Sequence, residues 1–380
     1  MGSSRTMRIG GFGRLRELSL GGEAPVLIQT MWKDRLDPSH LEGEAGEALL
    51  KRIEGLERLG CGLLRFAVPD LQAAETLGEL ASRLSLPLCA DIHFDHTIAL
   101  RCLDFPIAKL RINPGNIGSP GRVEKVLLKA GGKKVPIRIG VNAGSLPPEL
   151  RRRFESGEID RGEALVRAAL DELGHFEQFG FDRVVVSMKA SGIADTIKAN
   201  RLFRQQSDVP LHIGVTEAGP LIAGTVRSTA ALLPLLSEGI GDTLRVSLSD
   251  TEENEVIAGR EILTALRDTS AGGPQSGSPQ GSRSRAGRGA VIVSCPRCGR
   301  NSFDTLAFTA RWKDRLYALD TDCTIAVMGC AVNGPGEAKH ADLGITGAGN
   351  KVLIFKKGKV VRTVDAPEAD GAFGEELKTL

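Results

Sequence analysis

The chain has 380 residues, of which 41% are hydrophobic, enough for a large buried core and for two domains. Its 49 basic and 47 acidic residues leave a net charge of only +2, which excludes a general attraction to nucleic acid or to membrane lipids. No apolar stretch is long enough to span a bilayer and no signal peptide is recognisable, so we expect a cytoplasmic protein whose seven cysteines are thiols or metal ligands rather than disulfides.

Residues 24–266 alternate between short β-branched runs and longer amphipathic stretches, a pattern typical of βα units that build a parallel sheet. Eight strands are predicted, at 25–30, 62–68, 87–93, 108–113, 136–142, 183–189, 210–216 and 243–248. Helices are predicted between or after them, as at 44–59, 162–178 and 254–266. Eight units in about 250 residues match a closed (β/α)8 TIM barrel. We assign it to residues 1–268, with an open doubly wound sheet as the alternative.

Residues 269–289 form a segment rich in Gly, Ser, Pro and Arg that offers almost nothing to bury. This composition predicts a flexible linker. The remaining residues, 290–380, are predicted to form a second, smaller α/β domain with strands at 290–294, 324–328 and 351–355. All the metal ligands proposed below lie in this second domain.

Polar residues spaced by two close several of the predicted barrel strands, at the end where this fold carries its active site. Two of them are acids, Asp91 and Glu217. Five are cations: Arg65, Arg111, Arg138, Lys189 and Arg245. Any one arginine can extend to solvent, but burying several unpaired cations at one mouth is unfavourable without a bound polyanion. A phosphate or diphosphate ester is therefore predicted as the ligand. Further polar groups at these strand ends are His93, Asn113, Asn142, Ser187, Thr216 and Ser247.

A run of thiols near the end of the chain predicts a metal centre. Cys295-Pro-Arg-Cys298 places two cysteines on a turn, and Cys330 follows about thirty residues later. Three thiolates leave one metal position for a weaker ligand, and Glu337 on the following glycine-rich turn is the nearest candidate. A structural zinc knuckle is the alternative for the Cys-x-x-Cys pair. The other cysteines are predicted to pack in the core as small apolar residues: Cys61, Cys89, Cys102 and Cys323.

Six stretches carry a resemblance to a known family. They are ADIHFD at 90–95, LRINPGNIG at 110–118, PIRIGVNAGSL at 136–146, GVTEAG at 214–219, SEGIGDTLRVSL at 237–248 and GCAVNGPGE at 329–337. These motifs are long and specific, and the similarity extends from about residue 24 to residue 360. The chain resembles the 4-hydroxy-3-methylbut-2-enyl diphosphate synthases of the methylerythritol phosphate route to isoprenoids.

The resemblance implies a barrel joined to a domain that holds a [4Fe-4S] cluster through Cys295, Cys298, Cys330 and Glu337. The implied reaction is the reductive ring opening and dehydration of 2-C-methyl-D-erythritol 2,4-cyclodiphosphate to 4-hydroxy-3-methylbut-2-enyl diphosphate. Ferredoxin or flavodoxin is the implied electron donor, and the chain has no Gly-x-Gly-x-x-Gly nucleotide fingerprint before a helix.

The same resemblance assigns roles to the acids at the barrel mouth. Glu217 is the candidate proton donor to the leaving hydroxyl, positioned by Thr216, Asp91 and His93. A hydrogen-bonded core residue is the alternative for His93. The nine substrate-binding candidates are Arg65, Arg111, Asn113, Arg138, Asn142, Ser187, Lys189, Arg245 and Ser247.

Two features depart from the family pattern. Met31-Trp-Lys-Asp-Arg35 stands where the family has a threonine-rich segment, which leaves the contribution of the first strand open. The linker is also longer than expected. Family members are homodimers in which the cluster domain of one subunit covers the barrel of the other, and we prefer this arrangement to closure within one chain. The competing function is a phosphate-binding or sensing barrel with a structural zinc domain, in which Glu337 would have no role.

Overall fold

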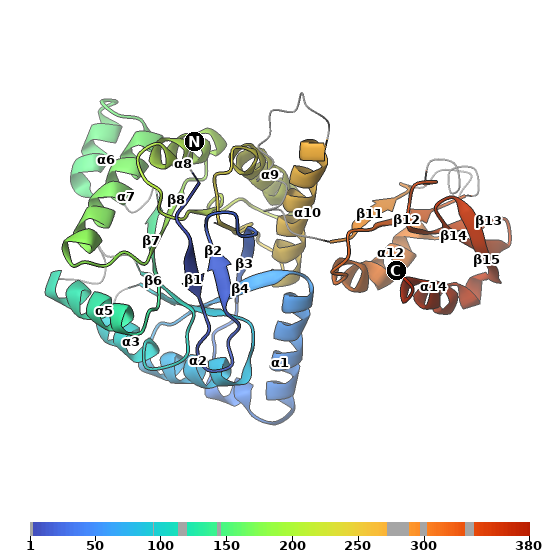
Figure 1. Ribbon diagram of the computed structural model, residues 1–380, viewed down its shortest axis with the longest axis horizontal. Coiled ribbons are helices and arrows are strands. Elements are labelled where there is room, and N and C mark those ends of the chain that lie inside the picture. Colours follow the sequence, from blue (N-terminus) through green and yellow to red (C-terminus); the bar gives the residue numbers. More distant parts are fainter. Residues whose placement is uncertain are drawn as a thin grey trace. The chain divides into compact units, whose positions relative to one another are not determined.

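The computed structural model describes residues 3–93, 95–112, 120–142, 146–271, 289–296, 302–330 and 338–380. The chain divides into two compact units, Met1–Gly287 and Arg288–Leu380 (Figure 1). Each unit has a sheet and a hydrophobic core of its own. Within the described residues no helix combines the length and the apolar character that a membrane crossing requires.

The first unit is a closed barrel of eight parallel strands, which confirms the predicted TIM barrel. Its strands are β3 (Leu27–Met31), β4 (Cys61–Ala67), β5 (Leu88–Ile92), β6 (Lys109–Ile112), β7 (Ile137–Asn142), β8 (Val184–Lys189), β9 (His212–Ile213) and β10 (Thr243–Leu244). The sheet order is β8-β7-β6-β5-β4-β3-β10-β9. A parallel bridge between Val186 and Leu211 joins the two ends of this order, so the sheet has no free edge and the open-sheet alternative is wrong.

Helices form the outer layer of the barrel (Figure 1). They are α1 (Gly43–Arg58), α2 (Leu71–Arg83), α3 (His96–Cys102), α5 (Pro120–Gly132), α6 (Pro148–Glu155), α7 (Arg161–Gln178), α8 (Ile193–Arg204), α9 (Leu221–Ser237) and α10 (Glu252–Ala271). Asp70 and Asp160 cap two of them by accepting backbone N–H bonds, as short polar side chains do before a helix. The structure places 269–271, the first part of the predicted linker, in the last turn of α10. Residues 272–288 lie outside the described ranges.

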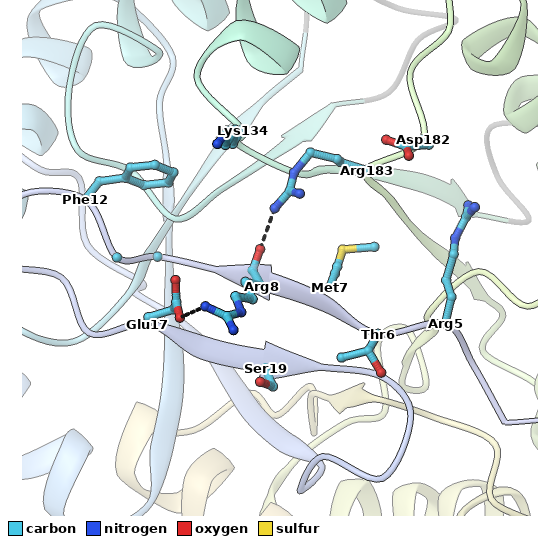
Figure 2. A pocket seen from close by; sticks show the side chains of 12 residues that line it. Arg5, Thr6, Met7, Arg8, Phe12, Glu17, Ser19, Lys134, Asp182 and Arg183 are labelled. Carbon is cyan, nitrogen blue, oxygen red and sulfur yellow. Dashed lines mark hydrogen bonds and ion pairs between the residues drawn. The ribbon is translucent and has the colours of Figure 1, made fainter.

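An antiparallel hairpin that the sequence did not predict precedes the barrel, formed by β1 (Met7–Ile9) and β2 (Leu18–Leu20). Its apolar side chains pack against residues near the strand starts, including Cys89 and Val185. Arg183 donates to the carbonyl of Arg8 on β1 over 2.7 Å (Figure 2). Both residues line a cavity of about 650 Å³ beside the hairpin. The hairpin therefore covers the amino-terminal end of the barrel and leaves the other end open for a ligand.

The second unit is a five-stranded mixed sheet with helices. Its strands are β11 (Val291–Ser294), β12 (Thr324–Met328), β13 (Leu343–Ala348), β14 (Lys351–Lys356) and β15 (Lys359–Asp365), and its helices are α12 (Thr305–Tyr317) and α14 (Ala369–Leu377). The strands β11, β12 and β13 are parallel, and β14 and β15 are antiparallel. The sequence predicted β11, β12 and β14 but missed β13, whose Gly344 makes room for the Phe355 ring, and the mostly exposed edge strand β15.

The four cysteines predicted to lie in the core are buried: Cys61, Cys89, Cys102 and Cys323. For three of them, Cys61, Cys89 and Cys102, burial raises the pKa of the thiol. A raised pKa keeps them protonated and unreactive at neutral pH. Their place in the core is therefore consistent with packing rather than chemistry.

Candidate functional site

A cavity of about 230 Å³ opens at the carboxyl ends of the barrel strands. The structure brings together there most of the predicted site residues. The lining consists of Met31, Arg65, Asp91, His93, Arg111, Arg138, Asn142, Ser187, Lys189, Val215, Thr216, Arg245 and Ser247. Of the remaining candidates, Asn113 lies outside the described residues, and Glu217 follows the lining residue Thr216 but is itself exposed.

Strand register explains why three charged groups meet in this cavity. Asp91 on β5 pairs with Arg111 on β6, which in turn pairs with Arg138 on β7. Residues that pair in register point to the same face of a sheet, here the barrel interior. Gly140 completes the arrangement, because a Cβ at this position would lie 3.0 Å from Arg111 Nε. The glycine thus leaves space for the guanidinium.

Asp91 is the centre of a buried ionic network. Arg111 Nη1 donates to its Oδ1 over 2.9 Å, and Arg65 Nε lies 3.4 Å from its Oδ2. Burial alone would raise the pKa of Asp91, but His93, Arg65 and Arg111 outweigh it and hold that pKa below its usual range. His93 Nε2 lies 2.8 Å from Arg111 Nη1, and the side chain is 47% exposed, so His93 belongs to the rim of the cavity and not to the core.

Arg138 is a deeply buried arginine whose guanidinium is not fully hydrogen-bonded within the described part of the chain. The residue is 2% exposed, and its Nε and Nη1 have no hydrogen-bond partner among the residues that the structure describes. Burial, together with repulsion by Arg65 and Arg111, lowers its pKa to about 9. A buried guanidinium with two nitrogens unsatisfied is unfavourable in the empty protein. These nitrogens are donors available to an anionic ligand.

Glu255, an acid that sequence reasoning missed, neutralises Arg245. Of the two acids predicted to point inward, Asp91 is buried but Glu217 is exposed, and the second buried acid that pairs with a cavity cation is Glu255. Glu255 is 1% exposed and accepts two bonds from Arg245, over 2.9 and 3.1 Å. It also accepts from Thr30 Oγ1 over 2.6 Å. Glu255 lies on α10 rather than on a strand, so the alternation of strand residues could not reveal it.

The segment Met31–Arg35, which departs from the family pattern and begins at the last residue of β3, has two roles. Met31 lines the cavity, and its sulfur accepts a contact of 2.7 Å from Arg65 Nη2. Lys33 Nζ lies 3.1 Å from the carbonyl of Leu248 and 3.4 Å from Glu255. The sequence left open whether the first barrel strand contributes to the site. The structure shows that this strand, β3, does contribute to the cavity wall through Met31.

With Asp91 and Glu255 paired, the five cations of the cavity outnumber the acids by three when all are ionised. Lys189 is buried near several arginines, and burial together with Arg138 and Arg65 places its pKa well below the usual value. A small, cationic cavity of this kind suits a ligand with several negative charges.

Two thiols of the second unit, Cys295 and Cys330, follow the carboxyl ends of neighbouring parallel strands of its sheet. Cys295 directly follows β11, and its backbone N–H donates to Val327 on the neighbouring parallel strand β12 over 2.9 Å. Cys330 lies two residues beyond the end of β12 and is 7% exposed. Cys295 packs against a buried apolar cluster that includes Ala338, the residue after Glu337. Cys298 and Glu337 fall outside the described residues, and within those residues no three His, Cys, Asp or Glu side chains gather as metal ligands.

The chain is similar to known proteins over nearly its whole length. Residues 13–260 match the GcpE TIM-barrel domain, and residues 291–379 match the GcpE protein C-terminal domain. A relative from Treponema pallidum, named 4-hydroxy-3-methylbut-2-en-1-yl diphosphate synthase (flavodoxin), is 50% identical over 99% of this chain and 92% of its own length. Relatives of the same name from Treponema denticola and Geobacter sulfurreducens are 48% and 42% identical, over 99% and 94% of this chain and 98% and 94% of their own lengths.

A solved structure of dihydropteroate synthase from Xanthomonas albilineans is similar with a TM-score of 0.48 and 16% identity, covering 70% of this chain and 99% of that chain. The two domain matches together cover both units of the structure, and the sequence relatives extend across both as well. The chain therefore belongs to the GcpE family.

Proposed function

We propose that the barrel mouth binds 2-C-methyl-D-erythritol 2,4-cyclodiphosphate by its diphosphate and that this chain converts it to 4-hydroxy-3-methylbut-2-enyl diphosphate. Arg138 carries the proposal, because its two buried nitrogens have no partner among the described residues and the phosphate oxygens are acceptors of the right charge. Arg65, Arg111 and Lys189 are further donors, and the remaining binding candidates are Asn113, Asn142, Ser187, Arg245 and Ser247.

The reaction takes up two electrons, and the chain is an oxidoreductase of isoprenoid synthesis by its family. A ring C–O bond breaks, and one hydroxyl leaves as water after it accepts a proton. The names of the relatives specify flavodoxin, which supports flavodoxin rather than ferredoxin as the electron donor of this chain. The alternative of a phosphate sensor with structural zinc is not favoured by these relatives. A cytoplasmic location remains a prediction.

The proposed cofactor is a [4Fe-4S] cluster held by Cys295, Cys298, Cys330 and Glu337. The cluster supplies single electrons at low potential. The placement of Cys295 and Cys330 at the ends of adjacent parallel strands fits this ligand set, because parallel strands bring the residues that follow them to the same edge. Three thiolates and one carboxylate suit iron better than a closed structural zinc site.

Protein groups of the barrel supply the proton and the orientation. Glu217 is the proposed proton donor, and Thr216, Asp91 and His93 are proposed to position it. Its φ of 53° supports this role, because a non-glycine residue in the left-handed region carries strain that functional sites often retain. Asp91 stays ionised and keeps Arg65 and Arg111 in place for the ligand.

Replacement of Glu217 by Gln is expected to reduce kcat about a hundredfold while changing KM less than threefold, because general acid catalysis is lost and the cationic ligand contacts remain. Glu238 is a matched control, since it pairs with Arg201 at the end of α9 away from the cavity lining. Glu238→Gln should keep kcat near wild type. Equal kcat values for the two variants would remove Glu217 from the mechanism.

The function is tested by anaerobic assay of the purified full chain with the cyclic diphosphate and reduced flavodoxin. Formation of 4-hydroxy-3-methylbut-2-enyl diphosphate, detected by mass spectrometry, is the expected result. A protein that contains zinc and no sulfide, and that forms no product, would contradict the proposal.

We also propose domain limits of 1–268, 269–289 and 290–380, and a homodimer in which the cluster domain of one subunit serves the barrel of the other. Such an arrangement predicts that a mixture of Glu217→Gln and Cys330→Ser subunits is active, because one composite site keeps both native groups. Subunit exchange followed by the anaerobic assay tests this. A mixture no more active than its separate components, in exchanged dimers, would favour closure within one chain.

A further inference from the structure

Beneath the cavity, three polar side chains from consecutive barrel strands form a hydrogen-bonded chain. Lys189 at the end of β8 lies with its Nζ 3.0 Å from Nε2 of His212 on β9. Nδ1 of the same ring lies 2.7 Å from Oγ1 of Thr243 on β10. His212 and Thr243 are completely buried and do not line the cavity, whereas Lys189 does. The histidine and the threonine therefore reach a ligand only through Lys189.

The chemistry of the three groups fixes the direction of both bonds. The form of Lys189 that binds an anion is the ammonium, which has donors and no acceptor, so in that form Lys189 donates and His212 Nε2 accepts. Burial and the nearby cations Lys189 and Arg138 place the pKa of His212 well below its usual value, so the ring is neutral and has a lone pair to offer. The remaining ring proton is then on Nδ1 and donates to Thr243 Oγ1. The threonine thereby selects the tautomer that can receive Lys189.

The surroundings of the Lys189 amine show why such a support matters. The charged groups that act on it most strongly are Arg138, Arg65, Arg245 and Arg111, all cations that repel an ammonium. Gly214 contributes only backbone at this point, since a Cβ there would lie 2.8 Å from Lys189 Nζ. The two acids of the cavity are engaged elsewhere, Asp91 with Arg111 and Glu255 with Arg245. The lone pair of His212 is thus the acceptor that opposes this repulsion.

We propose that His212 is a positioning residue, which holds the Lys189 amine in place for the diphosphate with its tautomer set by Thr243. The proposal rests on the diphosphate site described above and adds a part of the site that neither the sequence motifs nor the cavity lining contain. An amine that is held in its binding position before the ligand arrives loses less side-chain entropy when the ligand binds. His212 therefore acts on affinity and not on the chemical step.

The test is a calorimetric titration of the full chain with inorganic pyrophosphate, comparing His212→Asn with His212→Gln. Asparagine keeps an amide near the Nδ1 position that can donate to Thr243, but offers nothing to Lys189. Glutamine places an oxygen near the Nε2 position. We expect the Kd to rise about tenfold for the asparagine variant, the size of one hydrogen bond to a charged group, and less than about threefold for the glutamine variant.

A double-mutant cycle separates positioning from general damage to the core. In a Lys189→Met background, His212→Asn should leave the Kd unchanged, because the amine that it positions is gone. Thr243→Val, nearly isosteric, should weaken binding severalfold, and Thr243→Ser should restore it. These threonine variants also test the proposal if His212→Asn does not fold.

Two outcomes overturn the inference. One is a His212→Asn variant that melts at a lower temperature than wild type but binds pyrophosphate equally well, since this is the behaviour of a purely structural histidine. The other is an equal loss of affinity with and without Lys189. If wild type binds pyrophosphate and the cycle gives the expected coupling, but the cyclic diphosphate is not turned over, the proposed reaction fails and the positioning role stands.

Discussion

Replacement of Arg138 by Met is expected to stabilise the ligand-free barrel and, in the same variant, to lower kcat/KM at least a hundredfold. The stability gain follows from removing a buried guanidinium whose Nε and Nη1 lack partners among the described residues. Substituting an unsatisfied buried ion by an apolar chain of similar length gains about 1 to 4 kcal/mol in comparable cases. The gain should be measured by chemical denaturation of the protein without ligand.

The loss of activity follows from the same two nitrogens. Each would donate a charge-assisted bond to the diphosphate, worth about 1.5 to 3 kcal/mol, so losing both costs roughly a hundredfold or more in kcat/KM. A stabilised and inactive variant distinguishes a binding group from a structural one. If Arg138→Met were destabilised, the guanidinium would have partners in the protein that account for its burial, and its assignment to the ligand would be wrong.

Lys109 provides the matched control for this experiment. It is a fully buried cation in the same barrel interior, it bonds to Gln29 Oε1 over 3.1 Å, and it does not line the cavity. Burial lowers its pKa to about 7, so folding favours the neutral amine and the ammonium opposes folding. Lys109→Met should therefore gain most stability below pH 7, and the gain should shrink as pH rises toward the usual pKa of lysine. Its kcat/KM should stay within about threefold of wild type.

The sequence predicts this barrel well because alternation and strand ends are local properties. Asp91, Arg111 and Arg138 could be placed together from their positions on three successive strands, and the register observed between those strands agrees. Glu255 and His212 could not be found in this way. Glu255 enters the site from the helix after the last strand, and His212 acts one layer below the mouth, so each depends on tertiary contacts that no spacing rule contains.

In the second domain, too, strands with a clear local pattern were predicted and a strand without one was missed. The strands β11 and β12 read clearly as β-branched runs, and they position Cys295 and Cys330. The strand β13 was missed because two glycines interrupt its pattern, although they are needed where side chains of neighbouring elements approach the backbone. Cys298, Asn113 and Glu337 lie outside the described residues, so their parts in the site remain predictions.

Cys330→Ser is expected to abolish both the iron content and the activity, whereas Cys323→Ser is expected to retain both. The comparison is unusually well matched. Both thiols are 7% exposed, and they lie beyond opposite ends of the same strand. Cys323 comes directly before β12, and Cys330 lies two residues after it. Similar burial means a similar packing penalty for the hydroxyl, so a difference between the variants reports ligation rather than folding.

Iron and sulfide analysis of anaerobically purified protein is the direct measurement, with absorption near 400 nm as the second readout. Wild type and Cys323→Ser should each contain about four iron and four sulfide per chain. A serine at 330 would replace a soft thiolate by a hydroxyl that binds iron poorly at neutral pH, so the cluster should be lost or incomplete. If Cys330→Ser kept the full cluster and Cys323→Ser lost it, the ligand would lie before β12, and the fold of this domain would bring a different edge of the sheet to the metal.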